Sequence, residues 1–121
     1  MQTRIMLVED RADFRHLMSA LLGRQPDLKV VAQAGSLAEA RRHTTSVKFE
    51  VAILDMGFPD GNGADLIRDL RAANPGVAVL VLSASLDPEN LERATEAGAD
   101  EILDKFAERD EILGAIRRIR A

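Results

Sequence analysis

The sequence predicts an α/β fold in which a doubly wound, five-stranded parallel sheet carries helices on both faces. Five short apolar runs alternate with five segments of helical period along the 121 residues. Three of the runs are continuous rather than alternating, as in strands buried on both faces of a parallel sheet. Gly, Pro and Asn residues separate the segments, so each strand can be followed by one helix. Right-handed crossovers then give a doubly wound sandwich.

The strands are expected at five apolar runs. The first, third and fourth runs are continuous and should lie in the centre of the sheet. The second and fifth are shorter and more polar and should lie nearer its edges. In chain order, the runs are Ile5-Met6-Leu7-Val8, Val30-Val31-Ala32, Val51-Ala52-Ile53-Leu54, Val77-Ala78-Val79-Leu80-Val81-Leu82 and Ile102-Leu103.

Helices are expected after these runs. The first helix has the clearest amphipathic stripe and should end at Gly23. A capping box from Ser36 to Glu39 opens the second. The stripe of the first helix consists of Phe14, Leu17, Met18, Leu21 and Leu22. The third helix is marked by Leu66, Ile67 and Leu70, the fourth by Asp87 and Pro88, and the fifth by Ile112, Leu113, Ile116 and Ile119.

Composition indicates one domain, spanning residues 1–121. The absence of cysteine excludes disulfides, thiolate metal sites and a cysteine nucleophile. The net charge of -4 gives no general electrostatic footprint for nucleic acid. No apolar run approaches membrane-spanning length. We therefore expect a cytoplasmic domain that contacts neither DNA nor membrane itself.

Polar side chains follow four of the five predicted strands. Glu9 and Asp10 follow the first strand, Asp55 the third, Ser83 the fourth and Lys105 the fifth. The carboxyl ends of parallel strands form one edge of the sheet, where ligands bind in such folds. Three carboxylates brought together there repel one another, and Mg²⁺ with its preference for oxygen ligands is the usual remedy. With the hydroxyl and the ammonium, the set suits phosphoryl transfer to or from a carboxylate.

Each of these residues also has an ordinary structural explanation. An acidic pair after a strand is often a helix cap, and a single Asp at a strand end is often a turn former. Ser83 could close its strand with a backbone hydrogen bond, and Lys105 could be a solvated charge. Their joint presence at four strand ends favours a functional site.

The chain resembles the receiver domains of two-component response regulators over essentially its whole length. The motifs that carry this resemblance are Glu9-Asp10, Asp55 with Phe58-Pro59 and Gly63 behind it, Ser83-Ala84, and Lys105. The segments Val30–Ser36 and Glu111–Arg117 are similar to those of the nitrate-regulator, or LuxR-tailed, branch. The resemblance implies a flavodoxin-like three-layer sandwich with strand order 2-1-3-4-5.

The resemblance also implies a role for each site residue. Asp55 would accept a phosphoryl group from a sensor histidine kinase. Glu9, Asp10, Asp55 and the backbone carbonyl of Gly57 would hold Mg²⁺. Gly57 offers no side chain over the acceptor, so we expect water to reach the aspartyl phosphate and shorten its lifetime.

Phosphoryl binding and switching would fall to Ser83, Ala84 and Lys105. Ile102 occupies the position of the aromatic residue whose ring usually reports activation, so the usual readout is lost. Phe106 follows Lys105 where proline is common. It could take part in signalling, but a place in the core is the preferred interpretation.

The sequence therefore predicts a phosphorylation-controlled signalling module, not an enzyme beyond its own phosphorylation and dephosphorylation. No output domain is expected in the chain, so DNA would be bound only by a domain outside it. Two alternatives stay open: a scaffold that is never phosphorylated, and a Mg²⁺-dependent phosphohydrolase with Asp55 as nucleophile. A homodimer through the fourth helix, fifth strand and fifth helix is also expected. The residues proposed to form ion pairs there are Arg93, Glu96, Arg117 and Arg118.

Overall fold

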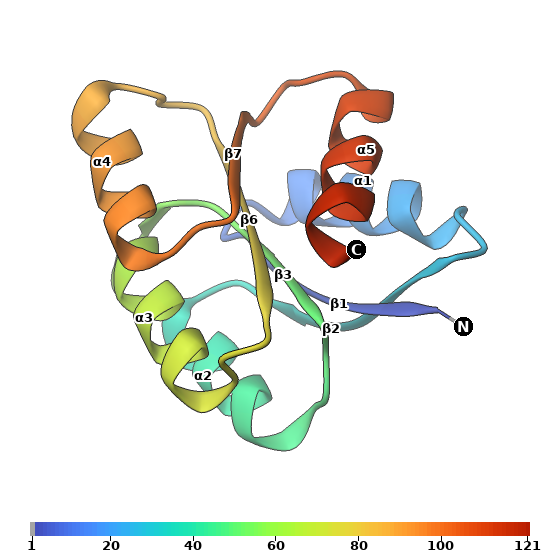
Figure 1. Cartoon of the computed structure of the whole chain (residues 1–121), viewed down its shortest axis with the longest axis horizontal. Helices are drawn as coiled ribbons and strands as arrows, with labels where there is room; N and C mark the ends of the chain where they lie inside the picture. Colours follow the sequence, from blue (N-terminus) through green and yellow to red (C-terminus); the bar gives the residue numbers. More distant parts are fainter. Residues whose placement is uncertain (1) are drawn as a thin grey trace.

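Residues 2–121 of the computed structural model are described, and their main feature is a five-stranded parallel sheet between two layers of helices (Figure 1). The strands are β1 (Thr3–Val8), β2 (Leu28–Ala34), β3 (Val51–Leu54), β6 (Ala78–Ser83) and β7 (Glu101–Asp104), and a short antiparallel hairpin pairs β4 (Gly57–Phe58) with β5 (Gly61–Asn62). The helices are α1 (Ala12–Gly23), α2 (Leu37–Ser46), α3 (Gly63–Ala73), α4 (Pro88–Ala97) and α5 (Arg109–Arg120).

The sheet confirms the predicted fold class and strand order. Its order is β2-β1-β3-β6-β7, and every neighbouring pair is parallel. Because the predicted strands correspond to β1, β2, β3, β6 and β7, this is the order 2-1-3-4-5. The chain leaves β1 in one direction to form β2 and then returns to the other side of β1 to form β3. The crevice between β1 and β3 is therefore the switch point at which such sheets bind ligands.

Continuous apolar runs form the central strands because side chains from both faces of each strand are buried. Along β1, Ile5 and Leu7 belong to the core beneath α1 and α5, whereas Met6 and Val8 belong to the core beneath α2, α3 and α4. All residues of β3 and β6 are buried. The edge strands β2 and β7 include exposed or half-buried residues, as their more polar sequences predicted.

The predicted helix boundaries are confirmed by their capping contacts. Ser36 Oγ accepts a hydrogen bond from the backbone N–H of Glu39 at 3.1 Å, and Asp87 accepts one from the N–H of Asn90 at 2.9 Å. Helix α4 ends at Gly98, whose φ of 105° lies in the left-handed region that favours glycine.

Two apolar side chains that the sequence placed in or near the core are exposed. Leu17 was expected on the buried stripe of α1 but is 69% exposed, and Phe106 is 74% exposed rather than part of the core. Helix α1 buries only Met18 and Leu22 completely against the sheet. The predicted stripe is therefore wider than the surface that the sheet covers. The β4–β5 hairpin was also not predicted, because it consists of turn-forming residues.

Three of the four residues proposed for intermolecular ion pairs already have carboxylate partners within the chain. Arg93 binds Glu89, Arg118 binds Glu101, and Arg117 binds Asp27 at 2.9 Å. The hydrogen bond from Arg117 lowers the pKa of Asp27. The homodimer stays a prediction, and these arginines would have to exchange partners to stabilise it.

Within residues 2–121, no helix is both long enough and apolar enough to span a bilayer.

Candidate functional site

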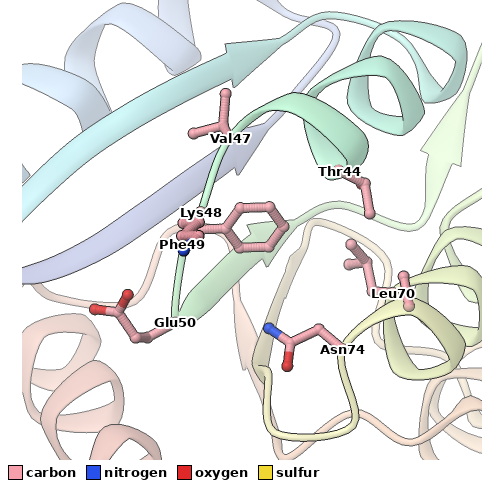
Figure 2. Close-up of a pocket in the computed structure, with 8 residues that line it drawn as sticks. Thr44, Val47, Lys48, Phe49, Glu50, Leu70 and Asn74 are labelled. Atoms are coloured by element: carbon pink, nitrogen blue, oxygen red, sulfur yellow. The ribbon is translucent and has the colours of Figure 1, made fainter.

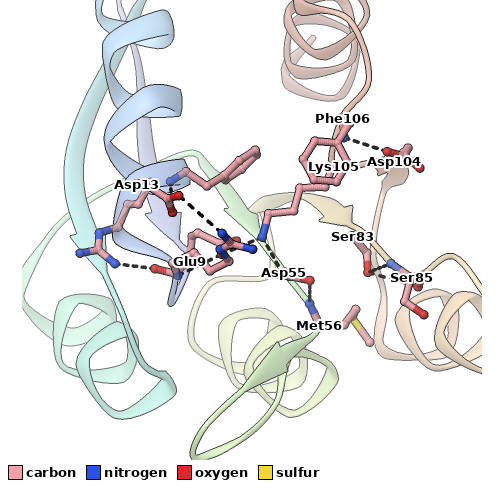
Figure 3. Close-up of polar contacts among 12 residues, drawn as sticks. Glu9, Asp13, Asp55, Met56, Ser83, Ser85, Asp104, Lys105 and Phe106 are labelled. Carbon is pink, nitrogen blue, oxygen red and sulfur yellow. Dashed lines mark hydrogen bonds and ion pairs between the residues drawn. The ribbon is translucent and has the colours of Figure 1, made fainter.

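The carboxyl edge of the sheet brings the predicted site residues together (Figure 3). Val8 pairs with Leu54 across β1 and β3, so Glu9 and Asp55, each one residue further on, lie side by side. Ser83 is the last residue of β6 and pairs with Asp104 of β7, which Lys105 follows directly. The register of the parallel sheet thus aligns residues that are far apart in the sequence.

Lys105 connects two of the carboxylates. Its Nζ lies 2.8 Å from Glu9 Oε1 and 3.3 Å from Asp55 Oδ2. The side chain of Lys105 is 6% exposed, and that of Glu9 is 3% exposed. Burial acts to lower the pKa of Lys105, but the hydrogen bond and charge of Glu9, reinforced by Asp55, outweigh burial and raise this pKa above its ordinary value. The ammonium therefore stays charged at neutral pH.

Glu9 is the most buried acid of the site. Burial raises the pKa of its carboxyl group above the ordinary value. Hydrogen bonds from Lys105 and from the backbone N–H of Arg11, the latter at 3.1 Å, offset part of this effect. Glu9 thus depends on Lys105 to remain ionised inside the protein.

The three acids are close enough to share one cation. One carboxylate oxygen from each of Glu9, Asp10 and Asp55 lies within 4.8 Å of the others, and Asp10 is exposed while Asp55 is half-buried. Asp55 Oδ1 also accepts a hydrogen bond from the backbone N–H of Met56 at 2.6 Å. A set of hard oxygen donors with one side open to solvent fits Mg²⁺, which keeps several of its waters. Gly57 begins β4 in the same loop and is exposed.

A cavity of about 230 Å³ opens beside Asp55. Gly57, Ser83 and Ala84 line it. Ser83 Oγ is buried and makes its contacts locally: it donates to the carbonyl of Ser85 and accepts from the N–H of Ser85, both at 3.2 Å. The hydroxyl would have to leave Ser85 to reach a group on Asp55.

Ile102 lies in β7 and is half-buried. It packs against the core beneath α2, α3 and α4. Ile102 was predicted to replace the usual aromatic residue at this position. In the structure it contributes to the packing of the sheet.

Sequence reasoning missed two residues that shape the site. The ring centroid of Phe14 lies 4.6 Å from Lys105 Nζ. Phe14 lies in the first turn of α1, four residues after Asp10, and this closeness in the sequence was the available signal. Asp60 accepts hydrogen bonds from the N–H groups of Leu37 and Ala38 at 3.0 and 3.1 Å, and these bonds lower the pKa of Asp60. Asp60 thereby ties the loop after Asp55 to the start of α2, a tertiary contact that no local pattern reveals.

A larger cavity, of about 370 Å³, lies at the opposite end of the sheet. Figure 2 shows Val47, Phe49 and Leu70 around it. Phe49 lies two residues before the start of β3. The residues of the carboxyl-edge site do not line this cavity: they are Glu9, Asp10, Asp55, Ser83 and Lys105. It is thus separate from the carboxyl-edge site.

The arrangement at the carboxyl edge suits one kind of chemistry. A half-buried carboxylate faces a cavity, an ammonium lies against it, and two further acids can hold a cation nearby. These groups can position and neutralise a phosphoryl group while the carboxylate oxygen attacks it.

Comparison with known proteins agrees with the fold and the site, and the similarity extends over most of the chain. Residues 5–117 match the response regulator receiver domain family. The DNA-binding transcriptional activator DevR/DosR of Mycobacterium tuberculosis is 36% identical over 118 residues, which are 98% of this chain and 54% of that protein. The protein-glutamate methylesterase/protein-glutamine glutaminase 1 of Caulobacter vibrioides is 35% identical over 106 residues, 87% of this chain and 31% of that protein.

A solved structure agrees with these relatives. The crystal structure of a LuxR-family two-component response regulator from Aurantimonas sp. SI85-9A1 superimposes with a TM-score of 0.92 at 28% identity, covering 99% of this chain and 86% of that one. The chain spans about half the length of the first of the curated relatives, or less in the case of the methylesterase.

Proposed function

This chain belongs to the response regulator receiver domain family, and we propose that Asp55 accepts the phosphoryl group through which it signals. The contact that carries the proposal is the one between Lys105 Nζ and Asp55 Oδ2, which are 3.3 Å apart. Asp55 also lines the 230 Å³ cavity. Together these observations support an acceptor carboxylate with a cation against it and an open space beside it that is large enough for a phosphoryl group.

In the transfer, an oxygen of Asp55 forms a bond to the phosphorus atom of the donor. The P–N bond of a phosphohistidine, or the P–O bond of a small acyl phosphate, breaks, and its electron pair leaves with the donor. The product on Asp55 is an acyl phosphate. Lys105 neutralises charge on the acceptor and then on the phosphoryl oxygens. Mg²⁺ held by Glu9, Asp10, Asp55 and the Gly57 carbonyl would supply further positive charge there.

We assign the response to Ser83 and Ala84. The hydroxyl of Ser83 exchanges the backbone of Ser85 for a phosphoryl oxygen, and Ala84 moves with it at the cavity wall. Ser85 Oγ binds Asp87, the cap of α4, at 2.8 Å, so movement of this turn is transmitted to the start of α4. This route does not require a ring at position 102.

For the whole protein, we propose a transcriptional response regulator in which residues 1–121 form the receiver domain. A sensor histidine kinase would supply the phosphoryl group in the cytoplasm, and an output domain outside this sequence would bind DNA. DevR/DosR and the LuxR-family structure support this role, whereas the methylesterase shows that relatives also carry other activities. Nothing in the site or the comparisons favours the scaffold or the phosphohydrolase.

Incubation with Mg²⁺ and acetyl phosphate should add one phosphoryl group, seen by intact-protein mass spectrometry. The adduct should disappear in Asp55→Asn and in the presence of EDTA. Asp110→Asn, which removes an exposed carboxylate at the start of α5, is the matched control and should keep the adduct. A persisting adduct in Asp55→Asn would exclude this acceptor, and repeated turnover of an external phosphoester would indicate a phosphohydrolase.

Replacing Gly57 by arginine should lengthen the half-life of the aspartyl phosphate. A Cβ atom at position 57 meets nothing within 4 Å, so an added side chain begins in open space beside the cavity. If it hinders the attacking water, the half-life should rise about fivefold, which corresponds to about 1 kcal/mol in the hydrolysis barrier. Loss of the mass adduct with time measures this rate. Gly23→Arg, equally unobstructed but on α1, is the control; a half-life that matches this control would refute the effect.

A further inference from the structure

We propose that Phe14 is a positioning residue that holds the Lys105 ammonium at the phosphoryl acceptor through a cation–π contact. This inference rests on the proposed function of Asp55. The ring centroid of Phe14 lies 4.6 Å from Lys105 Nζ, well inside the distance at which an aromatic face attracts a cation. The residue is contributed by α1, whereas Lys105 follows β7.

The surroundings of Lys105 make this contact important. Its ammonium group is directed to Glu9 and Asp55, and the aromatic ring is a third, uncharged neighbour. With 6% of the side chain exposed, little water remains to compete for the charge. Cation–π attraction is stronger when the cation is desolvated in this way.

Phe14 is itself held in place by a second ring. The rings of Phe14 and Phe106 pack edge to face, with centroids 6.5 Å apart and an interplanar angle of 82°. The backbone N–H of Phe106 donates to Asp104 Oδ1 at 2.8 Å, which fixes the turn after β7 (Figure 3). The exposed Phe106 thus supports the ring that faces the lysine.

The contact also suits a lysine that must move. Lys105 is closer to Glu9, at 2.8 Å, than to Asp55, at 3.3 Å, and it has to turn toward oxygens on Asp55 during transfer. A hydrogen bond depends on direction and would break during that turn. The face of an aromatic ring attracts the ammonium over a broader range of positions. Phe14 can therefore retain the charge while its hydrogen-bond partners change.

Fluorination of the ring tests this directly. Phenylalanine carrying one, two or three fluorine atoms would be introduced at position 14 alone, because fluorine weakens the negative ring face with little change in shape. The urea midpoint without Mg²⁺ and the rate of adduct formation with acetyl phosphate and Mg²⁺ would be measured. Both should fall stepwise with the number of fluorine atoms. Phe14→Leu should slow adduct formation about threefold to tenfold, and Phe14→Tyr should retain most of the rate.

Two control series identify the partner of the ring. In the Lys105→Met background the urea midpoint should no longer fall stepwise with fluorination at position 14. Fluorination of Phe49, a buried ring at the far end of the sheet, should leave the rate unchanged. A flat series at position 14, or the same slope without Lys105, would overturn the proposal. If midpoints fall only when Lys105 is present but no adduct forms at all, the contact stands and the assignment of Asp55 fails.

Discussion

Replacing Lys105 by methionine should lower the free energy of unfolding by about 3 kcal/mol at neutral pH without Mg²⁺, the cost of breaking a buried ion pair. Methionine keeps the length of the side chain and can still pack against Phe14. It removes the only ammonium near Glu9 among the described contacts, and Glu9 is left buried beside the carboxylates of Asp10 and Asp55. Glu9 then either stays charged without a partner or takes up a proton, and both outcomes reduce stability.

Urea denaturation in EDTA and in Mg²⁺ measures this loss. Mg²⁺ should stabilise Lys105→Met more than the wild-type protein, because a divalent cation at the three acids replaces the missing charge. Lys29→Met, on an exposed position of β2, is the matched control and should change stability by less than about 0.5 kcal/mol. Equal losses in the two variants, or equal gains from Mg²⁺, would show that Lys105 does not compensate the acids.

Much of the site could be predicted because polarity changes abruptly at the strand ends. Asp55 ends an apolar run, and Lys105 follows another, so each stands out locally. The parallel topology then brings them to one edge without further information. Strand order and site were therefore linked predictions: the observed register between β1 and β3, which sets Glu9 beside Asp55, supports both.

The contacts of individual side chains could not be predicted in the same way. Lys105 was expected at the phosphoryl group on Asp55, but its shorter contact is with Glu9. Ser83 lies at the end of its strand as predicted, but its hydroxyl group contacts the backbone of Ser85. Both depend on the direction of a side chain, which is determined by tertiary packing rather than by position along a strand.

The exposed side chains of Leu17 and Phe106 show a second limit of prediction from the sequence. Periodicity identifies an apolar stripe on α1, but it does not say how far the neighbouring elements cover that stripe. Phe14 is partly buried against the core beneath α1 and α5, while Leu17, less than one turn further, is open to solvent. Together with Phe106 they line a cavity of about 450 Å³ next to Lys105. These apolar residues, which the sequence indicated for the core, thus line a cavity beside Lys105 instead.

Gly63→Ala should be the most damaging single-methyl addition near the acceptor. A Cβ atom at position 63 would overlap the carbonyl oxygen of Asp55 and lie 3.0 Å from the Cα atom of Met56. Both neighbours are backbone atoms, and the N–H of Gly63 donates a hydrogen bond to the Met56 carbonyl at 2.6 Å. Neither segment of backbone can therefore move away without losing stability. We expect a loss of about 2–3 kcal/mol in unfolding free energy, typical of overpacking. Because the strain falls on Asp55 itself, adduct formation should also slow severely.

The comparison with Gly23→Ala separates strain from the change of residue type. Gly23 is also helical, but a Cβ atom there meets nothing within 4 Å, so alanine should leave stability unchanged or raise it by up to about 1 kcal/mol. Urea midpoints and acetyl phosphate kinetics of the two variants provide the measurement. If Gly63→Ala behaved like Gly23→Ala, the start of α3 would not constrain the acceptor. Loss of both stability and phosphorylation would instead show that the glycine allows α3 to begin directly against the backbone that presents Asp55.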